Sequence, residues 1–241
     1  MALPLNSTPV YTLTVPSTEK QVKYRPFLIK DEKALMIAQQ SEDAKAMLNT
    51  LKSVIRSCLD IKGQEAIDVD SLATFDLEYI FTQIRAKSVG ERVELFLKCD
   101  TCEDEKAVTQ VNLDLTQLKV EKNPDHTSKI NLYDDVGIVL KYPSLELITQ
   151  LENLDTENVE QMFDVVVECI DYIYTSTEVF HAKEQTKDEL REFLNNMTSE
   201  QFAKVQQFFE TMPRLKKDID YKCPVCGKEH HKVLEGLQSF F

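Results

Sequence analysis

Two CxxC pairs, separated by 120 residues, constrain this chain more than any other feature of its sequence. The pairs are Cys99 with Cys102 and Cys223 with Cys226. A two-residue gap lets both thiolates of a tight turn face one ion, and four thiolates in a tetrahedron are a typical ligand set for zinc. We therefore expect these four cysteines to bind one structural zinc ion.

The length of the gap makes the arrangement unusual. In a compact zinc ribbon roughly 15–20 residues separate the two pairs. Here the segment between the pairs is long enough to be an inserted helical region. A covalent link that closes a loop of this size stabilises the fold by about 5 kcal/mol in the chain-entropy model. A metal ion would act in the same direction, which favours a structural role.

Other uses of the cysteines have to be weighed against zinc. Redox-active pairs and unrelated thiols are alternatives, although both pairs lie between strand-like segments rather than at a helix start. A catalytic zinc site would keep an open position, which four cysteines would fill. His230 and His231 could replace one cysteine, but we interpret them as solvated residues or neighbours of the ligands. Cys58 and Cys169 lie on apolar helical stripes and are expected in the core.

Hydrophobic patterning predicts the class α+β, mostly helical, with a small antiparallel zinc-ribbon-like β element made of the two distant CxxC knuckles. Strand-like alternation marks Tyr11, Leu13 and Val15, and again Val93, Leu95 and Leu97. Helical spacing predicts a buried helix around Ile80 that is apolar on several sides, and an apolar stripe that runs through Ile170 and Ile173. Capping boxes of Thr186 with Glu189 and of Thr198 with Gln201 begin later helices. The polar residues 116–135, which include His126, are interpreted as a loop. The predicted regions are an extended N-terminal arm (1–30), a helical region (31–91), a β region with the first knuckle (92–143), an inserted helical region (144–218), and the second knuckle with the C-terminal tail (219–241).

Composition and motifs exclude several classes of function. The net charge of -13 opposes binding to nucleic acid and to anionic membranes. There is no run of about 18 apolar residues for a membrane span, and residues 1–20 contain no apolar core of a secretory signal. The sequence has no GxSxG, HExxH or phosphate-binding GKS/GKT motif. We therefore expect reduced cysteines, no small-molecule substrate and no enzymatic activity.

Several short motifs together carry a resemblance to a known family. They are Lys23–Leu28 (KYRPFL), Phe75–Tyr79 (FDLEY), Arg85–Glu91 (RAKSVGE), Phe208–Phe209 with Met212–Pro213, the two CxxC pairs, and Gly236–Phe241 (GLQSFF). In combination they resemble the baseplate hub assembly proteins of T4-like contractile-tailed phages. The resemblance extends from about Tyr24 to Phe241, and residues 103–200 contribute little to it.

This resemblance implies a late structural or assembly role in the central hub of the tail baseplate. The implied partners are other baseplate hub proteins, and the implied location is the host cytoplasm during assembly or the virion tail baseplate. The candidate partner contacts, chosen because they are of the aromatic and arginine types enriched at binding hot spots, are Tyr24, Arg25, Phe27, Phe240 and Phe241. The alternative is that these residues anchor the arm and the tail to the protein's own core.

Two further functions remain as alternatives. A zinc- or thiol-dependent enzyme would require an open metal position or a strongly perturbed thiol in a cleft. A zinc-ribbon adaptor for nucleic acid is opposed by the acidic charge.

Overall fold

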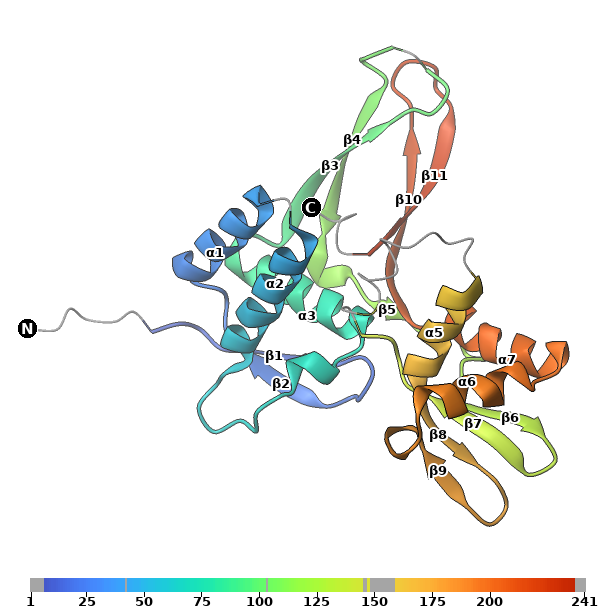
Figure 1. Ribbon diagram of the computed structural model, residues 1–241. Helices are drawn as coiled ribbons and strands as arrows, with labels where there is room; N and C mark the ends of the chain where they lie inside the picture. Colours follow the sequence, from blue (N-terminus) through green and yellow to red (C-terminus); the bar gives the residue numbers. More distant parts are fainter. Residues whose placement is uncertain (1–6, 42, 103, 145–146, 148–158, 237–241) are drawn as a thin grey trace, which may run out of the picture. The chain divides into compact units, whose positions relative to one another are not determined.

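A short antiparallel ladder divides the chain into two units. The computed structural model of the protein describes residues 7–41, 43–102, 104–144, 147 and 159–236. In it, strand β5 (Val120–Glu121) pairs with the start of strand β10 (Arg214–Lys222). The chain between these two strands forms unit 2, Lys122–Pro213, and the remainder forms unit 1 (Figure 1).

Three helices make up much of unit 1, and in the second of them the apolar residues recur at the three- and four-residue spacing of a buried helical face. They are α1 (Ile29–Gln40), α2 (Ala44–Leu59) and α3 (Thr74–Ser88). Helix α3 is apolar on several sides, as the sequence predicted, and it is the most deeply buried of the three. Its buried apolar residues are Phe75, Leu77, Ile80, Phe81, Ile84 and Ala86.

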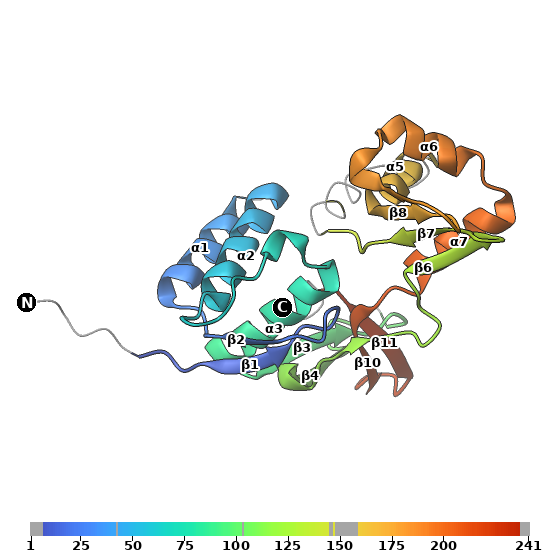
Figure 2. The same cartoon turned by 90° about the horizontal axis from the view of Figure 1, so that it is seen from below.

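The N-terminal segment of unit 1 forms a hairpin within the predicted arm. Strand β1 (Tyr11–Thr14) pairs antiparallel with β2 (Gln21–Tyr24), and Figure 2 shows the hairpin running along one side of the helices. Leu13 and Val22, which are register partners, are both buried. The alternation of apolar and polar residues therefore predicted this strand correctly.

Two longer hairpins complete unit 1. One consists of β3 (Arg92–Lys98) and β4 (Val108–Asp114), and the other of β10 and β11 (Glu229–Glu235). Both are side by side in Figure 1 and share a hydrophobic core. Its buried members are Ala86, Leu97, Leu113, Leu115, Leu118, Leu215, Ile219, Tyr221 and Leu234.

Unit 2 is a four-stranded antiparallel sheet with helices packed on one face. The sheet has the order β6 (Lys129–Tyr133), β7 (Val136–Leu140), β8 (Ile170–Tyr174) and β9 (Val179–His181). The helices are α5 (Val159–Cys169), α6 (Lys187–Asn195) and α7 (Ser199–Glu210). The capping boxes predicted for α6 and α7 are both present, with Thr186 and Thr198 as their N-cap residues.

The prediction of a mostly helical protein is wrong. Of the described residues, 39% lie in helices and 27% in strands, and these strands form four sheets. Strands β8 and β9 lie in the region predicted to be helical, and β5 and β6 lie in a segment interpreted as a loop. Ile170 and Ile173 are three residues apart, as on one face of a helix, because the ladder between β7 and β8 is irregular there. Leu140 pairs with Ile170 but Val139 pairs with Tyr172, so β8 has one extra residue at this point.

Among the described residues, no helix is both long enough and apolar enough to cross a bilayer.

His126 is built into unit 2, although the sequence placed it in a polar loop. Its Nδ1 lies 3.0 Å from the Thr211 hydroxyl and its Nε2 lies 3.0 Å from the Tyr142 hydroxyl. Thr211 donates its own proton to the Gln207 carbonyl at 2.7 Å. The Thr211 hydroxyl therefore accepts from Nδ1–H, and Nε2 accepts from Tyr142, which fixes a neutral imidazole. Burial lowers the pKa of His126.

We predict that acid loosens unit 2 through this histidine. Because the pKa of His126 is lower in the folded protein than the usual value of about 6.5, the unfolded chain takes up the proton first as the pH falls. The contribution of His126 to stability is complete above about pH 6.5 and is lost as the pH falls further, until His126 is protonated in the folded protein as well. Hydrogen exchange of the α7 amides at pH 7 and pH 5.5 would measure the effect. His126→Gln should reduce the pH dependence, and an unchanged dependence would contradict the assignment.

Candidate metal centre

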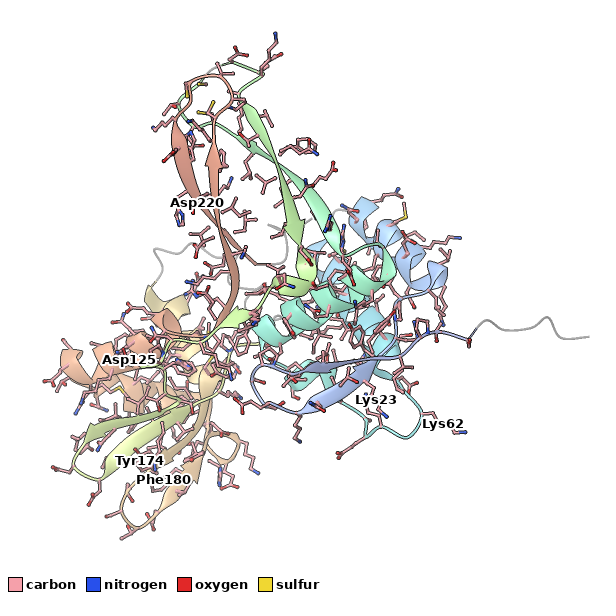
Figure 3. The ribbon with its side chains drawn as sticks, turned by 180° about the vertical axis from the view of Figure 1, so that it is seen from behind. Lys23, Lys62, Asp125, Tyr174, Phe180 and Asp220 are labelled. Carbon is pink, nitrogen blue, oxygen red and sulfur yellow. The ribbon has the colours of Figure 1, made fainter. Side chains whose placement is uncertain are left out.

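The four cysteines of the two CxxC pairs come together at the far ends of the two long hairpins of unit 1. Cys99 directly follows β3 and Cys102 lies in the connection to β4, while Cys223 and Cys226 lie in the connection from β10 to β11. Figure 3 shows sulfur atoms gathered at the ends of these hairpins. The fold therefore brings together residues that are more than 120 positions apart.

The distances between the sulfur atoms fit one tetrahedral ion. The Sγ atoms of Cys99 and Cys226 are 3.9 Å apart, as are those of Cys102 and Cys223. All four sulfurs lie within 4.8 Å of one another. Metal–sulfur bonds of about 2.3 Å in a tetrahedron require sulfur separations of about 3.8 Å. A disulfide would need about 2.05 Å, and all four residues are free thiols.

Backbone hydrogen bonds hold each turn in the shape that presents its thiols. The Cys99 N–H donates to the Ala107 carbonyl at 2.8 Å, and the Cys223 N–H donates to the Lys228 carbonyl at 2.9 Å. The Gly227 N–H then donates to the Cys223 carbonyl at 3.0 Å, with a φ of 72° at Gly227. Glycine adopts this left-handed conformation without steric cost, so its position after the last cysteine is explained.

Side chains fasten the two hairpins to each other just below the sulfur cluster. The Thr109 hydroxyl donates to the Lys222 carbonyl at 2.9 Å, and the Tyr221 hydroxyl donates to the Lys98 carbonyl at 3.0 Å. Ala107, which is fully buried, packs beside Cys99 and Cys223. These contacts preorganise the cluster, because they fix the two turns relative to each other without help from the sulfurs.

The two histidines near the second pair have different surroundings. His230 stacks on Tyr221 with ring centres 5.0 Å apart, and its Nε2 lies 3.1 Å from the Cys99 sulfur. It is therefore a neighbour of the thiol cluster. His231 faces the carboxylates of Asp220 and Asp218 at 2.8 and 3.4 Å, which raise its pKa. The structure does not bring His231 to the sulfur atoms.

The surroundings of the cluster shift the pKa values of three of its thiols in different directions. Hydrogen bonds from the Thr101 hydroxyl and backbone lower the pKa of Cys99 to about 5. A backbone hydrogen bond from Lys228 lowers the pKa of Cys226. The hydrogen bond between Cys102 and Cys226 is the main cause that raises the pKa of Cys102 to about 12. Thiolates crowded at 3.9 Å repel one another, so a bound cation is what would allow all four to ionise.

The other candidate residues lie elsewhere in unit 1. The Tyr24 side chain is only 2% exposed. Arg25 forms an ion pair with Asp31 at 3.1 Å and a hydrogen bond with Ser57 at 2.6 Å. Phe27 is half-buried. This placement favours the anchoring alternative for Tyr24 and Arg25, while Phe240 and Phe241 lie outside the described residues.

Sequence reasoning did not identify Thr101, Thr109 and Tyr221 as parts of this centre. Thr101 lies inside the first CxxC pair, so its position was a local signal that could have been used. Thr109 and Tyr221 act across hairpins that are distant in sequence, and nothing in their local sequence identifies that contact.

We predict that Thr101→Val raises the pKa of Cys99 from about 5 toward the ordinary thiol value of about 8.5, because it removes the hydroxyl bound to the sulfur. Ultraviolet absorbance of thiolates in metal-free protein, titrated from acid to alkaline pH, would show the first ionisation moving upward. Thr109→Val is the matched control, since that hydroxyl bonds a carbonyl and no sulfur. A first ionisation unaffected by Thr101→Val would contradict this assignment.

Comparison with known proteins identifies the family. The model of the family described as T4 bacteriophage base plate protein matches residues 8–241. The baseplate hub assembly protein gp26 of Enterobacteria phage T4 is 25% identical over 232 residues, covering 96% of this chain and 97% of that protein. No solved structure matches. The resemblance read from the sequence is confirmed, and the chain belongs to the T4 bacteriophage base plate protein family.

Proposed function

We propose that this protein is a structural or assembly component of the central hub of a contractile phage tail baseplate. The observation that carries the proposal is the family match over residues 8–241. The relative from phage T4 is named as a baseplate hub assembly protein, and the two chains cover almost all of each other. An alignment of nearly full length leaves little room for an unrelated domain with a separate activity.

We propose further that the four-cysteine cluster binds one zinc ion and that this ion is structural. Four thiols with free sulfurs 3.9 Å apart suit the size and the tetrahedral preference of zinc. Four protein ligands leave no coordination position for a substrate, which supports assembly rather than catalysis. The ion would fasten β3–β4 to β10–β11 at the ends of the hairpins, where the shared hydrophobic core no longer reaches.

The partners in this proposal are other proteins of the baseplate hub. The protein would act in the host cytoplasm, where tails are assembled, and either leave or remain in the finished baseplate. Mass spectrometry of purified virions would separate these two outcomes.

We predict one zinc ion per chain in wild-type protein, and much less in Cys223→Ser, because three thiolates hold the ion poorly. Loss of the ion should loosen both hairpin ends, while helical circular dichroism is largely retained. The helices should remain folded because they pack in hydrophobic cores that do not include the four cysteines, such as the core of unit 2. Metal analysis and circular dichroism would measure both effects.

Cys169→Ala is the matched control for this experiment. Cys169 is a fully buried thiol of α5 and not part of the cluster, so its removal should leave the zinc content at one per chain. Wild-type protein that contains no zinc when purified from cells grown with zinc would contradict the metal assignment.

We predict that the wild-type chain co-purifies with the other baseplate hub proteins of its own phage when they are expressed together. Cys223→Ser should reduce the recovered complex, because the hairpins would lose their fixed arrangement. Size-exclusion chromatography of the co-expressed proteins would test this. No association of the wild-type chain with any hub protein would overturn the assembly function, whereas full association of the zinc-free variant would make the ion dispensable for it.

A further inference from the structure

The negative charge of the protein is concentrated almost entirely in unit 2. Between Lys122 and Pro213 there are eighteen Asp and Glu residues against seven Lys and Arg, a net charge of -11 out of -13. Unit 1 has twenty-three acidic and twenty-one basic residues, a net charge of -2. A surface on unit 2 would therefore select positively charged partners.

Among the described residues of unit 2, the helices α5, α6 and α7 leave one face of the sheet uncovered. Two cross-strand rows make up this open face, Lys129–Val139–Tyr172–His181 and Asn131–Gly137–Tyr174–Val179. None of these eight residues belongs to the core between the sheet and the helices, which takes the alternate row of Ile130, Ile138 and Ile173. The open face thus presents two tyrosines, a residue type enriched at the centres of protein interfaces.

The open face contains a hollow of about 510 Å³. It lies between β6 and β8 at the end of the sheet where both hairpin turns are found, and its lining residues are Lys129, Asn131, Asp134, Asp135, Tyr174, Thr175 and Ser176. Gly137 makes this shape possible, because a Cβ there would lie 2.2 Å from the Tyr174 hydroxyl oxygen. The Tyr174 side chain, labelled in Figure 3, lies across this glycine.

The chemistry of the hollow suits a cation. Asp134 and Asp135 line the hollow together with Tyr174, so two carboxyl groups and an aromatic ring share its wall. The ring already has the ammonium group of Lys129 at 4.8 Å from its centre, so its face is accessible to a positive charge. A guanidinium group can stack on such a ring and at the same time bond carboxylates, which an ammonium group does less well.

We propose that the open face docks a basic segment of another protein, with an arginine side chain entering the hollow beside Tyr174. The inference rests on the proposed function only in taking that protein to be another baseplate component. Nucleic acid would be repelled by the charge of unit 2, and so would the same unit of a second copy. The charge, the two half-buried tyrosines and the hollow therefore indicate one kind of occupant.

The test uses the full chain and a fluorescently labelled peptide with the sequence Gly-Ser-Arg-Arg-Ser-Gly. In fluorescence anisotropy we expect binding that weakens as salt is raised. A peptide with citrulline in place of arginine, which has the same shape without the charge, should bind at least about fivefold more weakly. Absence of binding by the arginine peptide, or equal binding of the two peptides, would overturn the proposal.

Variants separate this site from the general acidity of the unit. Asp134→Asn with Asp135→Asn, and Tyr174→Leu, should each weaken binding about fivefold, whereas Tyr174→Phe keeps the ring and should bind normally. Asn is tolerated at position 134, where φ is 42°. Glu192→Gln with Glu210→Gln removes the same charge from exposed positions on the helices and should have little effect. Equal losses in the two double variants would overturn the site.

Lys129→Met is expected to strengthen binding, whereas damage to the fold would weaken it. It removes the resident cation from the Tyr174 ring, so the arginine peptide should bind more tightly, by about threefold. Weaker or unchanged binding would count against the hollow as the site. Failure of the chain to associate with hub proteins would overturn the proposed function and leave these peptide results standing, so the two failures are distinguishable.

Discussion

The contact between the two long hairpins is the constraint on which unit 1 depends. In the described part of the chain, β3–β4 and β10–β11 belong to different sheets, so no backbone ladder joins them. They are held by apolar packing, by the hydroxyls of Thr109 and Tyr221, and by the convergence of four sulfurs. Apolar packing is not directional, so the hydrogen bonds and the sulfur geometry define the register of one hairpin against the other.

Local signals in the sequence predicted the local structure well. The capping boxes beginning at Thr186 and Thr198, the alternation in Val93, Leu95 and Leu97, and the apolar helix around Ile80 all match the structure. Each depends on residues within a few positions of one another. The two CxxC pairs also identified the four cysteines that the fold brings together, because their spacing is itself a signal.

The failures occurred where distant residues decide the structure. Strand β8 has an irregular ladder, so its apolar spacing imitates a helix until β7 is placed beside it. The two residues of β5 become a strand because β10 returns to pair with them. Likewise, the role of Gly137 depends on Tyr174, which is on another strand. Non-local pairing leaves no pattern within a short window, and these elements were therefore missed.

The ladder between β5 and β10 also has a consequence for how such a protein can evolve. Because Glu121 and Arg214 are register partners, the chain leaves unit 1 and re-enters it at neighbouring points. An ordinary tight turn could join these two strands in place of the whole of unit 2. Unit 1 is thus a scaffold with a built-in insertion point, at which segments of different length and charge could be exchanged without altering the strands on either side.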